Sequence, residues 1–178
     1  DIPLDISVQP GKYFEIIKVI VSIKDINDNI PTFPENPLQR YLSEASVPGT
    51  RITISTPIDA DSPAFGVQMY RQITGFDEFE LEVTNNTDGT VTLSLVLKKE
   101  LDREVKEFYQ VEVIAFDGKE TGSVNINIQV RDVNDNNPEF ENQTYETFVP
   151  ENMPKFSTII TVTARDPDAG PNGDITYS

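Results

Sequence analysis

Apolar and polar residues alternate along most of the chain with a period of two rather than the 3.6 of a helix. The clearest runs cover 91–97 and 109–115, where apolar residues occupy every second position. Further strand-like stretches are 39–43, 51–55, 67–73, 79–83 and 123–131. Asp88-Gly89 and Asp117-Gly118 are turn signals between neighbouring strands, and 98–107 has room for a helical turn or two. Seven short strands in about 107 residues predict an all-β antiparallel sandwich whose apolar residues form the core.

The chain also repeats itself at a fixed distance. The nine residues from Asp25 to Phe33 return from Asp132 to Phe140, an offset of 132 − 25 = 107. A whole small domain has about this length, so the period predicts tandem domains rather than a solenoid. We expect 1–33 to be the end of one domain, 34–140 a complete domain and 141–178 the start of a third. Neither outer piece should fold alone.

Composition removes several classes of function. The 178 residues include 30 Asp and Glu against 14 Lys and Arg, for a net charge of −16, and His, Cys and Trp are absent. Without His or Cys there can be no Ser-His-Asp or Cys-His catalytic arrangement and no imidazole or thiolate metal site. The negative charge argues against nucleic acid as a partner. No apolar run reaches the roughly 18 residues that would span a bilayer.

The repeated acidic segments carry the candidate chemistry. In 132–136 three side chains, Asp132, Asn134 and Asp135, offer oxygen donors, and 25–29 offers the same set. One such segment has two interpretations, a solvated acidic loop or a site for a hard cation. Repetition at a domain length favours the cation, with neighbouring domains supplying the other oxygens. An EF-hand starting at Asp25 or Asp132 is excluded, because neither start has Gly at position six and Glu at position twelve.

These segments belong to a larger motif set that resembles the calcium-linker motifs of cadherin extracellular repeats. The motifs are Asp25-Ile26-Asn27-Asp28-Asn29, Asp132-Val133-Asn134-Asp135-Asn136, Leu101-Asp102-Arg103-Glu104, Ala115-Phe116-Asp117-Gly118, Pro150-Glu151-Asn152 and the run from Asp166 to Gly173. The stretch 6–33 is further similar to the end of the first repeat of a protocadherin, which would make 34–140 the second repeat. The resemblance implies tandem seven-stranded Greek-key sandwiches, with immunoglobulin-like topology, joined by linkers that bind Ca²⁺.

The resemblance also implies a ligand set for each linker. At the second linker it consists of the side chains of Glu44, Asp102, Glu104, Asp132, Asn134, Asp135, Asp166 and Asp168, with backbone carbonyls of Val133, Asn136 and Asn172. At the first linker it consists of Asp25, Asn27, Asp28, Asp59, Asp61 and Asp117, with Ile26, Asn29 and Phe65 at the carbonyl positions. Phe65 stands where the family has Asn, so we expect the site to be kept with altered loop geometry. Further ligands of the first linker would precede Asp1, so we expect weak or partial occupancy there.

Single members of these sets have plainer alternatives. Glu44 could be a solvated strand residue, Asp102 and Glu104 could pair with Arg103 or Lys106 at the surface, and Asp117 could serve only its turn. Two glycosylation sequons, which matter only outside the cell, begin at Asn85 and Asn142.

The expected function is calcium-dependent cell–cell adhesion by an ectodomain on the extracellular side of the plasma membrane. The resemblance implies a homophilic partner, the same protein on an apposed cell, and a parent protein anchored by a single membrane span. The alternative is a calcium-rigidified spacer or tether without self-recognition. An enzyme using Asp102 and Glu104 as an acid/base pair is a further hypothesis, but we expect none, since both already have a cation role and no cleft is indicated.

Overall fold

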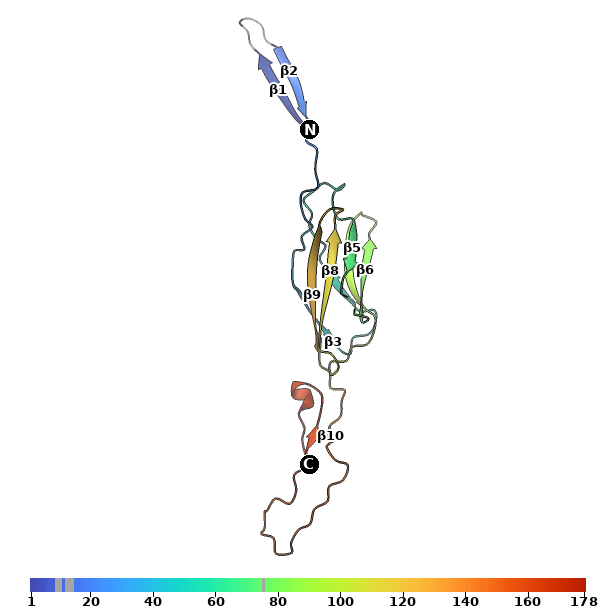
Figure 1. Cartoon of the computed structure of the whole chain (residues 1–178), viewed down its shortest axis with the longest axis vertical. Helices are drawn as coiled ribbons and strands as arrows, with labels where there is room; N and C mark the ends of the chain where they lie inside the picture. The colour runs from blue at the N-terminus through green and yellow to red at the C-terminus, as the bar shows by residue number, and fades with distance from the viewer. Residues whose placement is uncertain (9–10, 12–14, 75) are drawn as a thin grey trace.

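The computed structural model describes residues 1–8, 11, 15–74 and 76–178. Its elements follow one another along a single long axis (Figure 1). An N-terminal hairpin stands at one end, a two-sheet sandwich occupies the middle, and a C-terminal segment with little regular structure lies at the other end.

The middle sandwich contains seven strands in two sheets. They are β3 (Leu38–Ser43), β4 (Arg51–Ile54), β5 (Met69–Gln72), β6 (Phe79–Asn85), β7 (Val91–Leu97), β8 (Phe108–Phe116) and β9 (Thr121–Arg131). One sheet has the order β3-β9-β8-β5 and the other β4-β7-β6. The predicted seven-stranded all-β sandwich is confirmed, with one difference: β3 pairs with β9 in parallel, not antiparallel.

The alternation in the sequence becomes the core. Leu93, Leu95 and Leu97 of one sheet face Val111 and Val113 of the other, and all five are buried. Side chains of successive strand residues point to opposite faces, so period-two runs place one apolar set inside. Of the one or two helical turns predicted within 98–107, the structure has one turn. A hydrogen bond from the Lys106 N–H to the Asp102 carbonyl, at 2.8 Å, closes it.

The N-terminal hairpin repeats the β8–β9 pair. β1 (Ile2–Val8) and β2 (Glu15–Val21) place Ile2 opposite Val21, just as Tyr109 lies opposite Ile128, 107 positions later. Burial differs. Ile2 is 48% exposed and Tyr109 3%, because no second sheet formed by the described residues covers the hairpin. The hairpin thus has the form of a domain's last two strands without the rest of the sandwich.

The segment after β9 has only short elements, β10 (Glu139–Phe140), β11 (Ala164–Arg165) and the 3₁₀ turn η1 (Gly170–Gly173).

The chain that enters the sandwich, by contrast, is firmly packed. Pro31 and Phe33 are buried, and Gly122 lies so close to the Pro31 carbonyl that an added Cβ would stand 1.7 Å from its oxygen. The linker before the sandwich is therefore docked against β9.

Candidate metal centre

The end of the sandwich nearest the C-terminal segment brings Glu44 against the second linker (residues 132–136). Because β3 and β9 run in parallel, with Ser43 opposite Arg131, the residues that follow them leave the sheet side by side. The Glu44 N–H donates to the Arg131 carbonyl at 3.1 Å. Its side chain accepts the Val133 N–H at 2.6 Å. Strand pairing thus fixes this carboxylate relative to the linker.

Glu44 is one of the most buried carboxylates in the described chain, with 6% of its surface exposed. Its second oxygen accepts the Arg103 backbone N–H at 2.8 Å. The side chain therefore joins three segments, the end of β3, the loop between β7 and β8, and the linker. The alternative that Glu44 is a solvated strand residue is wrong.

Two contiguous groups of carboxylates form around the second linker. In the first, oxygens of Glu44, Glu104 and Asp132 lie within 4.8 Å of one another. In the second, oxygens of Glu104, Asp135 and Asp168 satisfy the same limit. Glu104 belongs to both groups, and Asp168 comes from the segment that follows β11. The fold thus gathers residues from both sides of the linker, which together with it we name the second joint.

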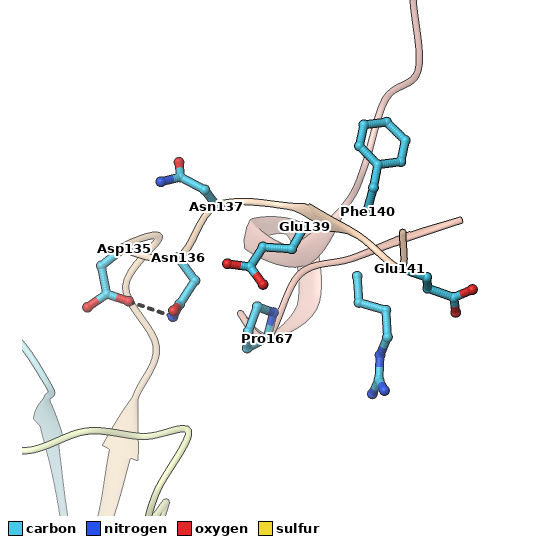
Figure 2. Close-up of a pocket in the computed structure, with 8 residues that line it drawn as sticks. Asp135, Asn136, Asn137, Glu139, Phe140, Glu141 and Pro167 are labelled. Atoms are coloured by element: carbon cyan, nitrogen blue, oxygen red, sulfur yellow. Dashed lines mark hydrogen bonds between the residues drawn. The ribbon is translucent and has the colours of Figure 1, made fainter. Parts of the chain in front are cut away.

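Hydrogen bonds hold the C-terminal segment against this linker. The Asp132 Oδ2 accepts the Ala169 N–H and the Asn172 Nδ2, each at 2.9 Å. The Asn136 Nδ2 donates to Asp168 at 2.7 Å. Figure 2 shows the side chains of Asp135 and Asn136 turned toward each other, and Pro167, on another segment to their right, lines the same pocket. Amide donors thus tie the C-terminal segment to the linker.

The first linker (residues 25–29) uses the same hydrogen bonds. The Ser62 N–H donates to Asp25 at 2.8 Å, the Asn29 N–H to Asp61 at 3.1 Å, and the Asp61 N–H to Asp59 at 3.0 Å. Each bond is found again 107 positions later, at 2.9, 3.3 and 3.0 Å. The linker and the residues facing it form the first joint. Two independent stretches therefore adopt one geometry.

In the described part of the chain, three buried oxygens of the first joint have no protein partner, namely Asn27 Oδ1, Asp59 Oδ2 and Asp117 Oδ2. Asp117 is completely buried, and its other oxygen accepts the N–H groups of Lys119 and Glu120, each at 2.7 Å. These bonds, led by that of Glu120, hold the Asp117 pKa below its usual value. Asp117 thus serves its turn and still keeps one oxygen free. An unpaired buried acceptor is costly, and all-oxygen donors suit a hard cation.

Two carboxylates of the second joint have raised pKa values, which a bound cation would lower. Burial, followed by repulsion from neighbouring carboxylates that include Glu44 and Asp168, raises the pKa of Asp135. Burial likewise raises the pKa of Glu104. Both shifts mean that the ionised form is disfavoured where it stands, so a cation there would stabilise the ionised groups.

Sequence analysis considered Arg103 only as a surface ion-pair partner, and the structure gives it a larger part. Its guanidinium contacts the side chains of Glu104 and Asp132, and it donates to the Pro167 carbonyl at 2.8 Å. The Arg103 side chain is 14% exposed and that of Glu104 20%, so the pair is partly covered. The arginine joins the loop, the linker and the C-terminal segment. Only its place between two acidic ligands in the sequence hinted at this.

Other predicted ligands divide between local and joint contacts. Asp102 accepts the Val105 N–H at 2.9 Å, so this oxygen caps its own turn. Lys106 pairs with neither acid in the described chain and lies 3.8 Å from the centre of the Phe76 ring. Asn134 reaches the carbonyl of Asn172 at 3.4 Å.

The remaining first-joint positions differ from their counterparts in detail. Ile26 has an exposed side chain, and Asn29 donates to Asp28 at 3.0 Å. Phe65 keeps the turn bond to the Ser62 carbonyl, at 2.8 Å, but cannot provide the amide that Asn172 gives at the second joint. A cation that sequence analysis missed, Lys119, donates to the Asn27 carbonyl at 3.0 Å.

Comparison with known proteins gives one consistent family. A model of the cadherin domain matches residues 39–131. Protocadherin-19 of Danio rerio is 42% identical over 167 residues, covering 92% of this chain and 15% of that protein. Human protocadherin gamma-A3 is 40% identical over 166 residues, covering 92% of this chain and 18% of that protein. The chain thus spans less than a fifth of the length of these relatives.

Solved structures agree. Repeats EC1-3 of mouse clustered PcdhgC3 superpose with a TM-score of 0.86 at 34% identity, over 99% of this chain and 56% of that one. Mouse cadherin-23 EC22-24 superposes with a TM-score of 0.74 at 31% identity, over 92% of this chain and 52% of that one. Among the described residues no helix is long and apolar enough to cross a bilayer. With a cadherin-domain match over more than half its length and a matching sandwich, the chain belongs to the cadherin family, whose members are adhesion proteins and not enzymes.

Proposed function

We propose that this chain is part of a calcium-dependent cell–cell adhesion ectodomain on the extracellular side of the plasma membrane. In this proposal 34–140 is one complete cadherin repeat, the second of its protein. Residues 1–33 end the preceding repeat, and 141–178 begin the next. The two joints are calcium sites that stiffen the row of repeats.

One observation carries the proposal: carboxylates from separate segments converge at the second joint. Oxygens of Glu104, Asp135 and Asp168 lie within 4.8 Å of one another, although the three residues belong to a loop, a linker and the next segment. Arg103 pairs with Glu104, but among the described residues no cation pairs with Asp135 or Asp168, so these charges repel unless a further cation lies among them. Oxygen donors from several segments are also what the large coordination shell of Ca²⁺ requires.

The residues of each joint have two tasks under this proposal. Asp25 and Asp132 accept backbone N–H groups from the following repeat, which sets the distance between repeats. Oxygens without protein partners, such as Asp59 Oδ2 and Asp117 Oδ2, are left to face the metal. Bound calcium would supply the positive charge that neutralises the cluster and makes the joint rigid.

The calcium affinity that we expect of these joints suits an extracellular location. Extracellular calcium modules bind with dissociation constants of about 10⁻⁴–10⁻³ M, which suits millimolar calcium outside cells and leaves such sites empty in the cytosol. Because protocadherins are the relatives, we propose a homophilic partner, the same protein on an apposed cell, and a parent protein held by a single membrane span.

Bead aggregation tests the proposal. Beads coated with the full ectodomain should aggregate in millimolar calcium and disperse when chelator is added. Beads that stay dispersed in calcium, while calcium still raises the unfolding midpoint, would favour the alternative of a non-adhesive spacer. No effect of calcium on either measurement would reject the metal sites.

A further inference from the structure

The edge of the three-stranded sheet has an unprotected half. Strand β6 is the outer strand in the order β4-β7-β6, so one side of its backbone has no strand neighbour. Along its first half, Gln72 of β5 covers that side. Its side chain accepts the Leu81 N–H at 2.9 Å and donates to the Phe79 carbonyl at 3.3 Å. Open strand edges are templates for pairing with another chain, so this cover has a protective effect.

The second half of β6 presents the same backbone groups, and no side chain among the described residues hydrogen-bonds to them in this way. Residues two apart on a strand direct their N–H and C=O groups to the same side, so Val83 and Asn85 continue the row begun by Leu81. Val83 is 40% exposed, and Thr84 and Asn85 are exposed as well. The stretch 83–85 contains no charge and no proline, which are the usual means of blocking an edge.

A glycosylation sequon begins in this open half. Asn85 is the last residue of β6, and Thr87, the third residue of the sequon, lies exposed in the turn that follows. The neighbouring Asn86 is engaged, because its amide donates to the hydroxyls of Thr90 and Thr92 at 2.8 and 3.0 Å. The hairpin thus holds Asn86 inward and presents Asn85 at the edge.

We propose that Asn85 carries an N-linked glycan that shields the open half of β6 from edge-to-edge pairing with a second copy. The inference rests on the extracellular location proposed above. The donor is a lipid-linked diphosphate oligosaccharide. Its sugar C1 forms a bond to the Asn85 amide nitrogen, the C1–O bond to the diphosphate breaks, and the diphosphate leaves with one amide proton. The attached sugar is bulky and hydrated, so it excludes a second backbone from the edge.

The first measurement is glycopeptide mass spectrometry of the full ectodomain secreted by animal cells. We expect most molecules to carry a glycan on Asn85. An unmodified Asn85 overturns the inference. If calcium-dependent bead aggregation persists with a bare Asn85, only the glycan proposal fails. If Asn85 is glycosylated but calcium has no effect on beads or stability, the proposed function fails instead.

The second measurement tests shielding by size-exclusion chromatography with light scattering, in chelator so that calcium-dependent adhesion does not contribute. N85Q and T87A remove the sequon from its two ends, and N142Q removes the other sequon as a matched control. We expect the first two to raise the weight-average mass about twofold or more with increasing concentration, and N142Q to match wild type. Adding V83K to N85Q should restore the monomer by charging the edge. Monodisperse N85Q and T87A, or association that V83K leaves unchanged, would refute the shielding role.

Discussion

Replacing Asp168 with Asn should remove one charge from the second joint at the cost of one hydrogen bond to its linker. The side chain is buried, with 7% of its surface exposed, and it accepts two hydrogen bonds from Asn136. Asn has nearly the same size but only one acceptor oxygen, so one of the two bonds from Asn136 is lost and the loop is held less firmly. The change also removes one negative charge from the group that includes Glu104 and Asp135. Calcium binding should therefore weaken more than folding without calcium does.

The size of the effect follows from linkage. With a dissociation constant of about 10⁻⁴ M and about 5 mM calcium, one bound ion stabilises the fold by roughly 2.3 kcal/mol. Losing a contact to a charged oxygen costs about 1.5–3 kcal/mol, or roughly 10- to 100-fold in affinity. The stabilisation by that ion then falls to roughly 0.2–1.1 kcal/mol. For a repeat of this length, the calcium-induced rise in unfolding midpoint should shrink by about 5–15 °C.

The assay is thermal unfolding by circular dichroism in calcium and in chelator, on a fragment extended to the end of its last repeat. In chelator, Asp168→Asn should unfold slightly below wild type, because one bond from Asn136 is lost while repulsion with Asp135 is relieved. Asp174→Asn is the matched control, since Asp174 is exposed and lies just after η1. An equal calcium-induced rise in wild type and Asp168→Asn, or an equal loss in Asp174→Asn, would refute the reasoning.

Three further predictions concern the same joints. Asp135 and Glu104 have raised pKa values in the folded state, mainly through burial, so their ionisation opposes folding; in chelator the unfolding midpoint should rise as pH falls from about 7 to about 5, and a flat or falling profile would contradict this. Gly122→Ala should destabilise the sandwich by about 1–3 kcal/mol in urea unfolding, because the new Cβ would stand 1.7 Å from the Pro31 carbonyl oxygen; a neutral effect would show that the linker is not docked there. Arg103→Gln should tighten calcium binding severalfold by calorimetry, since it removes a positive charge among the ligands, whereas Arg103→Lys should not; weaker binding by the Gln variant would instead show that the arginine positions the ligands.

Much of the fold could be predicted because alternation along a strand decides which side chains face the core. Each predicted strand is present, but its ends depend on contacts far away in the sequence. The predicted strand 67–73 is shorter in the structure, from Met69 to Gln72. The parallel pairing of β3 with β9 could not be predicted either, because no local pattern distinguishes a parallel neighbour from an antiparallel one.

For the joints, the 107-residue offset identified which acids are equivalent, and the repeated hydrogen bonds agree with it. Side-chain direction within a loop has no periodic signal, which is why Arg103 and Lys119 were missed as joint residues. The offset also could not tell which oxygens the protein satisfies by itself. One oxygen of Asp102 accepts a hydrogen bond within its own turn. One oxygen of Asp117 also accepts within its turn, while the other has no partner among the described residues.

That difference divides the acids of each joint into two kinds. Asp61 and Asp168 accept amide donors from their linkers, and these bonds need no cation to form. Asp135 accepts only from the neighbouring Asn136 among the described residues, and Asp59 Oδ2 has no partner there at all. The first kind fixes the loop and the second kind is left for a cation. Substituting the second kind should therefore abolish the response to calcium at little cost to the metal-free fold, which a random scatter of surface acids would not do.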